Sequence, residues 1–184
     1  MTNPPPNWMP WPAGITRGQA QAQIDAAAGG DQLPYLSLPA APSATGVAWP
    51  AANTAEFIRF RVGKALAITQ MAYGVGTAAG NVDLGIYAGD GTTWTRLAST
   101  GSTPAAGSGT QTIALSAPLT LQPGTDYWLA MAADSTALAA MRQSFASPMG
   151  LFGFQYFAKA AAFPLPATVT VPAGTTYTPW IGAQ

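Results

Sequence analysis

The chain from residue 56 onward alternates apolar and polar side chains in short runs, separated by Gly, Pro, Ser and Thr residues. Ile58, Phe60 and Val62 alternate with Arg59 and Arg61, as expected of a strand with one buried face. The pattern therefore predicts that the first strand of a β domain begins near this point.

The alternation in the next predicted strand changes phase partway along it. Residues 65–75 have strand character, but their apolar set shifts between Ile68 and Met71. An extra residue in one strand of a pair produces such a shift. The sequence therefore predicts a β-bulge near Thr69-Gln70.

The most regular alternation lies between Asn81 and Asp134, where charged residues are scarce. Val82, Leu84 and Ile86 fall on one face of a predicted strand. Turn signals recur at intervals typical of an antiparallel β-sandwich, and about eight strands in the body match a jelly roll. The other predicted strands span residues 94–99, 111–117, 126–133, 151–158, 168–171 and 177–181, with 137–145 either a strand or an irregular crossover.

Tyr127 and Trp128 are adjacent in a predicted strand, so their rings point to opposite faces of the sheet. Tyr127 shares its face with the large residues Leu129 and Met131, and it is the predicted core residue. Trp128 shares its face with two alanines. We expect it on the outer face, where a neighbouring subunit or a sugar could contact it.

Residues 1–52 lack the strand pattern and are predicted to form an arm ahead of a β domain over residues 53–184. Five prolines precede residue 13, which favours an extended, polyproline-like chain. One short helix is expected near residues 17–28, and it would need a partner surface to be stable. The apolar residues expected to anchor the arm are Trp8, Trp11, Ile15, Ile24, Tyr35 and Leu36.

The composition favours association over a solitary soluble molecule. Charged residues make up 8% of the 184 residues, the formal net charge is zero, and apolar residues reach 48%. Such a surface is poor for colloidal solubility, so we expect a homo-oligomer, with a trimer favoured. Seven basic residues argue against nucleic-acid binding. No apolar run would span a membrane, and the start of the chain has no signal-peptide pattern.

The chain has neither histidine nor cysteine. The commonest general base and metal ligand are therefore missing, and no catalytic residue, metal or cofactor is predicted. Asp83 and Asp126 could lie near each other on paired strands, as a glycosidase requires of two carboxylates. The turn and strand-end positions of most aspartates have a simpler backbone explanation.

The aromatic residues are the remaining candidates for a binding surface. Their number exceeds what one face of a sandwich needs. Trp94, Trp128 and Trp180 are the candidate contacts. A subunit interface is favoured over a glycan site because so little of the chain is charged.

Two segments resemble a jelly-roll module found in virion proteins of tailed bacteriophages. They are Val82 to Tyr87 (VDLGIY) and Leu121 to Ala130 (LQPGTDYWLA). The resemblance covers roughly residues 56–133. It implies a structural or attachment role on a virion, commonly as a trimer. The chain is shorter than most tail fibres and has no shaft, which fits a short fibre, a minor tail subunit or a capsid decoration protein.

Three functions follow as hypotheses. The first is a virion structural protein, made in the host cytoplasm, docked to other virion proteins by its arm and with a host-surface glycan as a further candidate partner. The second is a free, lectin-like carbohydrate-binding domain without enzymatic activity. The third is a small glycan hydrolase, which the lack of histidine and the few carboxylates disfavour.

Overall fold

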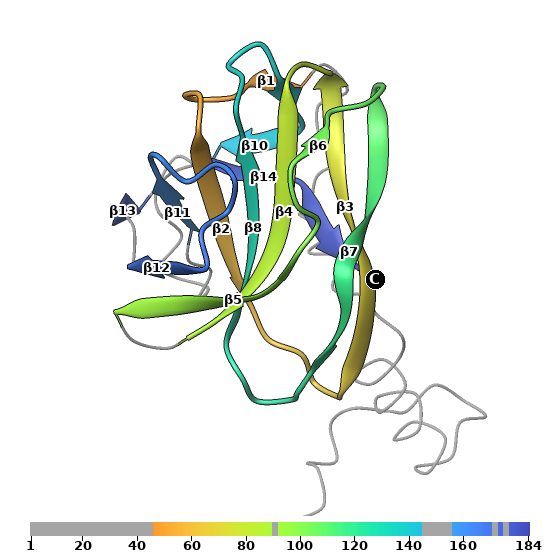
Figure 1. The fold of residues 1–184 in the computed structure, drawn as a ribbon, viewed down its shortest axis with the longest axis vertical. Coiled ribbons are helices and arrows are strands. Elements are labelled where there is room, and N and C mark those ends of the chain that lie inside the picture. The colour runs from red at the N-terminus through yellow and green to blue at the C-terminus, as the bar shows by residue number, and fades with distance from the viewer. Residues whose placement is uncertain (1–45, 90–91, 145–155, 171–172, 175–176) are drawn as a thin grey trace, which may run out of the picture. The chain divides into compact units, whose positions relative to one another are not determined.

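The computed structural model describes residues 46–89, 92–144, 156–170, 173–174 and 177–184 (Figure 1). The chain divides into two units, residues 1–32 and 33–184, and every described residue belongs to the second. All regular structure in these residues is β, and each strand pairing among them is antiparallel. No helix capable of crossing a membrane is found in this part of the chain. The predicted all-β class is confirmed.

The larger sheet has the order β12-β5-β4-β8-β2-β11-β13, with β6 pairing β4. Its central strands are long and its outer strands short. The bounds are β2 (Thr54–Phe60), β4 (Asn81–Ala88), β5 (Thr93–Ser99), β6 (Thr103–Pro104), β8 (Tyr127–Ala133), β11 (Tyr156–Lys159), β12 (Thr168–Thr170) and β13 (Ala173–Gly174).

The second sheet has the order β1-β9-β3-β15, with β7 pairing β3. A separate pair is formed by β10 and β14. The bounds are β1 (Val47–Ala48), β3 (Leu66–Thr77), β7 (Gly109–Leu121), β9 (Ala139–Ala140), β10 (Arg142–Ser144), β14 (Tyr177–Pro179) and β15 (Ile181–Ala183). The single strand expected over residues 177–181 is therefore split between a separate pair and the second sheet.

The two segments that carry the bacteriophage resemblance are neighbours in the larger sheet. Strand β4 pairs with β8 in a continuous register that runs from Val82 opposite Ala133 to Ala88 opposite Tyr127. β2 pairs with the other edge of β8, from Thr54 opposite Ala133 to Phe60 opposite Tyr127. The middle of the sheet is thus β4-β8-β2 (Figure 1).

A register shift lies where the β-bulge was predicted, and the extra residues belong to β7, because residues 115–118 are opposite Thr69 of β3. The register of β3 against β7 changes between Ile68, opposite Leu119, and Gln70, opposite Ala114. β3 keeps apolar side chains inward on both sides of this irregularity. Ile68 and Met71 are accordingly both fully buried.

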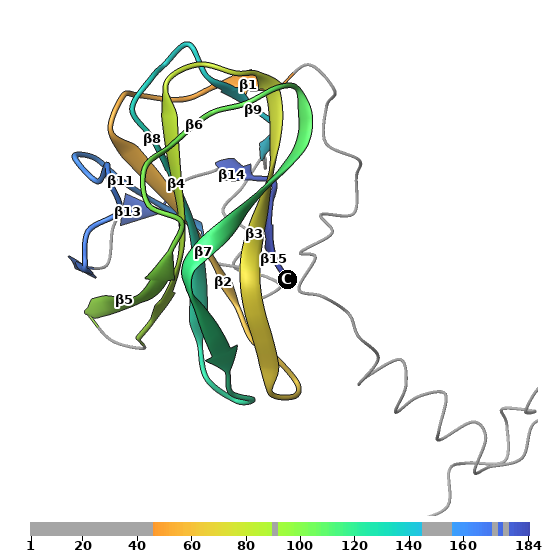
Figure 2. The same cartoon turned by 45° about the vertical axis from the view of Figure 1, so that its right-hand side comes forward.

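The main core lies between the two sheets, which face each other in Figure 2. The larger sheet contributes the predicted inward residues of β4 together with alternate residues of β2 and β8, and the second sheet contributes residues of β3, β7 and β15. Their burial comes from period-two alternation, which turns every second side chain inward. Representative members are Ile58, Leu84, Ile86, Leu129, Ile68, Met71, Leu121 and Ile181.

The β domain begins earlier than the expected boundary at residue 53. Trp49 is 2% exposed and belongs to the main core, and its indole N–H donates to the Thr54 carbonyl at 3.0 Å. Strand β1, just before it, pairs with β9. Residues 47–49 are therefore part of the folded body. The sequence signal was weak because a lone Trp among Ala and Pro has no strand periodicity.

Residues 1–45 of the expected arm, with its helix near residues 17–28, lie outside the described residues. The same holds for its proposed anchors, which are Trp8, Trp11, Ile15, Ile24, Tyr35 and Leu36.

Candidate functional site: an aromatic cluster beneath a C-terminal strap

A second apolar cluster lies on the face of the larger sheet that points away from the main core. We call it the outer cluster. It is centred on four buried rings, and small residues surround them. Its members are Phe57, Tyr87, Trp94 and Trp128 with Ala55, Ala130, Ala132, Ala162, Leu165 and Val169.

The four rings come from neighbouring strands and pack against each other. The indoles of Trp94 on β5 and Trp128 on β8 stack with centroids 3.9 Å apart and planes 20° apart. The ring of Phe57 on β2 packs edge-to-face against Tyr87, with centroids 5.4 Å apart. It is tilted against Trp94, with centroids 5.5 Å apart. Alanines at 55, 130 and 132 leave room for the rings across the sheet. Offset and edge-to-face contacts of this kind stabilise aromatic clusters beyond the area that they bury.

Residues 160–170 cover the outer cluster, and we call this segment the strap. It follows β11 and ends in β12 (Figure 1). Leu165 and Val169 are 2% and 1% exposed, and Val169 is opposite Trp94 in the β12–β5 pair. Leu165 packs over Gly85: a Cβ at Gly85 would lie 2.8 Å from Leu165 Cδ1. The glycine therefore creates the space that the strap fills.

Polar side chains of the sheet fix the strap backbone. The Asp83 carboxylate accepts the Leu165 N–H at 3.0 Å, and the Arg96 guanidinium donates to the Leu165 carbonyl. The Tyr87 hydroxyl donates to the Pro166 carbonyl at 2.7 Å. The strap thus satisfies backbone groups on its buried side without belonging to a regular sheet at that point.

Burial changes the protonation behaviour of two of these groups. Asp83 is fully buried, and burial raises the pKa of its carboxyl above the ordinary value. The Leu165 N–H, the charge of Arg96 and the Thr100 hydroxyl oppose that rise. Burial also raises the pKa of Tyr87, so its phenol stays protonated and remains a donor at neutral pH.

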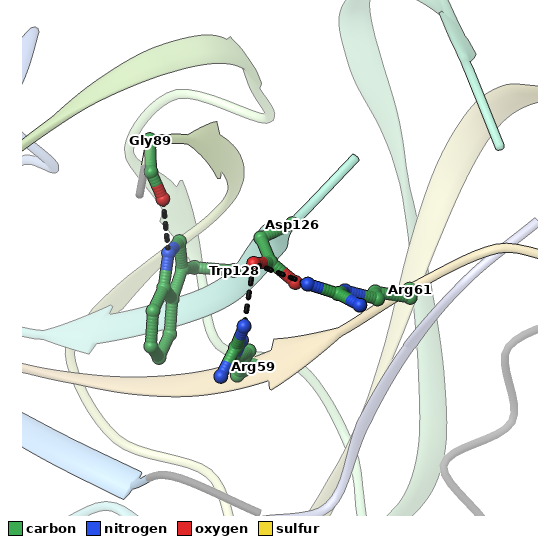
Figure 3. Close-up of polar contacts among 5 residues, drawn as sticks. All are labelled: Arg59, Arg61, Gly89, Asp126 and Trp128. Carbon is green, nitrogen blue, oxygen red and sulfur yellow. Dashed lines mark hydrogen bonds and ion pairs between the residues drawn. The ribbon is translucent and has the colours of Figure 1, made fainter. Parts of the chain in front are cut away.

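An ion cluster borders the outer cluster where β2 ends and β8 begins (Figure 3). Asp126 accepts hydrogen bonds from both Arg59 and Arg61, one of them from Arg61 Nη2 at 2.9 Å. These bonds hold the pKa of the Asp126 carboxyl well below its usual range. Nearby, the Trp128 indole N–H donates to the Gly89 carbonyl at 3.1 Å, which fixes the end of β4 beside the turn.

The structure brings together two of the three tryptophans that the sequence singles out, but it places them differently from the expectation. Trp128 does point away from the main core, as predicted, and Tyr127 points into it. The expected outward exposure is wrong, because Trp128 and Trp94 are 4% and 1% exposed within a single chain. Trp180 lies apart from them, half-buried between β14 and β15.

Sequence reasoning missed Phe57, Tyr87 and the strap as parts of this cluster. A usable signal was present in β2, β4 and β8. Their outward positions hold rings and very small residues, Phe57 with Ala55 and Tyr87 with Gly85, instead of the polar residues of a solvated face. Such a face predicts that another part of the protein covers it.

The carboxylates do not form the pair that a glycosidase needs. Asp83 is opposite Ala132, whereas Asp126 precedes the start of β8. Six residues of strand separate the two positions by roughly 20 Å, against about 5–9.5 Å in glycosidases. Glu56, also buried, has Met131 and Ala158 as register partners and lies on the face of the sheet opposite to that of Asp83. The described residues contain no group of acids, histidines or cysteines able to hold a metal ion.

Comparisons with protein-family models, with curated proteins and with solved structures find no match.

The outer cluster and the strap together close one face of the larger sheet. The rings of the cluster are buried, and the polar groups of Asp83, Arg96 and Tyr87 bond to the strap. The physical effect is to join the C-terminal part of the chain to the central strands.

Proposed function

We propose that this chain is a structural protein of a bacteriophage virion. Its β domain, a jelly-roll sandwich in this proposal, is displayed on the particle, and residues before the β domain form an arm that docks to other virion proteins. The observation that carries the proposal is the closed outer face of the larger sheet. The aromatic residues beyond those of the main core pack against each other within the same chain, and this packing stabilises the fold, as a structural protein requires.

The resemblance to bacteriophage jelly-roll modules supports this proposal. The first segment lies in β4, and residues 127–130 of the second lie in β8 directly opposite residues 85–88, so the two matches meet in one strand pair. Within that strand pair, Gly85 of the first segment accommodates the strap, and Trp128 of the second belongs to the outer cluster. The residues of the resemblance therefore have a shared structural role.

A lectin-like function is the alternative, and the burial of Trp94 and Trp128 weakens it. Sugar-binding sites stack exposed rings on the apolar faces of the sugar, whereas these two rings stack on each other. Trp180, half-buried, is the remaining tryptophan candidate for a glycan contact. A glycan contact therefore stays secondary to the structural role in this proposal.

Particle fractionation tests the proposal. The tagged chain is expressed in cells that produce the bacteriophage encoding it, and particles are purified on a density gradient. We expect the full chain in the particle band at a fixed ratio to the capsid protein. A chain lacking residues 1–45 should remain folded but stay at the top of the gradient. Recovery of the full chain only as free protein would contradict the proposed function.

A further inference from the structure

Strand β7 forms the longest terminal edge in the described part of the protein. It runs from Gly109 to Leu121 and pairs there with β3 alone. The terminal strands of the larger sheet, β12 and β13, span three and two residues. In Figure 2, β7 crosses the front of the domain with no strand drawn over it. A long edge of this kind presents backbone donors and acceptors on its outer side.

The edge carries no charge. Residues 97–125, which include all of β7, contain no Asp, Glu, Lys or Arg. Proteins commonly protect exposed edges with charged residues, above all lysine, because like charges prevent a second edge from approaching. In this chain that protection is absent over the whole strand, so two copies of β7 meet no electrostatic repulsion.

The irregularity opposite Thr69 of β3 divides β7 into two halves of different kinds. Residues 115–118 are opposite the single β3 residue Thr69, and Pro118 lies among them. Proline and an irregular register both prevent further pairing. The first half, Gly109–Ala114, keeps an unbroken register with β3. This half alone is regular enough to accept another strand.

The side chains of the regular half suit pairing with an identical strand. Thr110, Thr112 and Ala114 are exposed, whereas Ile113 packs partly against the main core. Threonine favours strands, and pairs of threonines across strands add to sheet stability. Leu97, one of two large apolar residues that are exposed in the described part of the chain, is on β5, which lies beside β7.

We propose that β7 is a homotypic interface in which residues 109–114 of two copies pair antiparallel about a two-fold axis. Antiparallel pairing of one strand with its own copy uses the same patch on both molecules, so the contact closes on itself and cannot extend into a fibre. It would join the second sheets of two copies into one continuous sheet, with Thr112 close to the axis.

This inference does not depend on the proposed virion role, because self-pairing is equally open to a free protein. It also differs from the trimer that the sequence favours. A two-fold edge contact gives a dimer, and the mass of the particle in solution separates the two arrangements.

Sedimentation velocity of the full chain over a range of concentrations tests the proposal. Thr112→Lys places two positive charges across the axis. We expect the dimer dissociation constant of this variant to be about tenfold higher than that of the unmodified chain. Thr168→Lys is the matched control: it places the same charge on an exposed threonine of another terminal strand, β12. The control should dimerise like the unmodified chain.

Circular dichroism of each variant checks that the β fold is retained, and Thr112→Val keeps strand propensity without charge and should preserve the dimer. A monomeric unmodified chain would overturn the proposal, as would a trimer. Equal effects of Thr112→Lys and Thr168→Lys would also overturn it, because the response would then reflect net charge and not the β7 edge.

Discussion

Asp83 on β4 and Asp126 just before β8 have surroundings that shift their pKa values in opposite directions. Asp83 is buried under the strap, and desolvation raises the pKa of its carboxyl. Asp126 accepts hydrogen bonds from two arginines, which lower its pKa. At the residue scale, acid titration therefore affects the two sites with opposite sign.

Replacing Asp83 should alter how stability depends on pH. A carboxyl whose pKa is raised in the folded state costs stability as pH rises from its unfolded value, about 3.9, through the folded value. Asp83→Asn removes this cost and keeps an oxygen that can accept the Leu165 N–H. Urea unfolding at several pH values should show the variant gaining stability relative to the original chain above pH 4. Parallel pH profiles would contradict the assignment.

Asp126 should show the reverse behaviour. Its lowered pKa means that the ion cluster stabilises the fold above the unfolded pKa of about 3.9 and loses that effect as pH falls through the folded value. Asp126→Asn should therefore destabilise the protein at neutral pH, and the difference should shrink in acid. The same urea series measures the difference in unfolding free energy between this variant and the original chain. A difference that stays constant down to pH 2 would show that the ion cluster is not its cause.

At the scale of elements, the strap and the sheet fit each other through Gly85 and Leu165. Gly85→Ala would place a Cβ 2.8 Å from Leu165 Cδ1 and 3.1 Å from the Ala98 carbonyl oxygen. Overpacking of this kind costs about 1–3 kcal/mol. Leu165→Ala deletes a buried side chain and should cost about 2–5 kcal/mol.

The double variant measures the coupling between the two elements. With Leu165 shortened, the added methyl at Gly85 loses its closest clash, so the double variant should be less destabilised than the sum of the single variants. Chemical denaturation of the four proteins completes the cycle. Strict additivity would show that the strap does not pack on Gly85 in solution.

The central strands could be predicted from sequence because their information is local. Alternation predicted the inward residues of β2 and β4, and a change of phase located the irregularity between β3 and β7. The strap could not be predicted in the same way. Residues 160–167, which precede the predicted strand that forms β12, have no periodicity, and their position depends on Asp83, Arg96 and Tyr87, which lie far away in sequence.

At the scale of the whole molecule, Trp49 marks where the folded body must begin. Removal of residues 1–45 should leave a cooperatively folding β domain, since Trp49 and β1 are retained. Removal of residues 1–52 deletes the buried Trp49 and should cost about 3–5 kcal/mol more, as loss of a buried aromatic does. Thermal melts of both truncated chains compare them. Identical melts would show that Trp49 contributes nothing to the core.

The candidate site was only partly predicted because its cover comes from a distant part of the chain. The placement of Tyr127 and Trp128 on opposite faces of the sheet was predicted correctly, because it follows from strand geometry alone. The sequence could not show that the chain itself covers the outer face. The covering residues come from a segment whose contacts with the sheet are long-range, and a bare sheet face with a tryptophan resembles an interface until its cover is known.

The account rests most heavily on the claim that one molecule buries both faces of its larger sheet. Chemical denaturation of Tyr127→Ala and Trp128→Ala in the full chain tests it most directly. Tyr127 packs on Phe60 in the main core, and Trp128 stacks on Trp94 in the outer cluster. Both variants should lose about 3–5 kcal/mol of unfolding free energy. A Trp128→Ala protein as stable as the original would mean that the outer face is open, and would contradict the account.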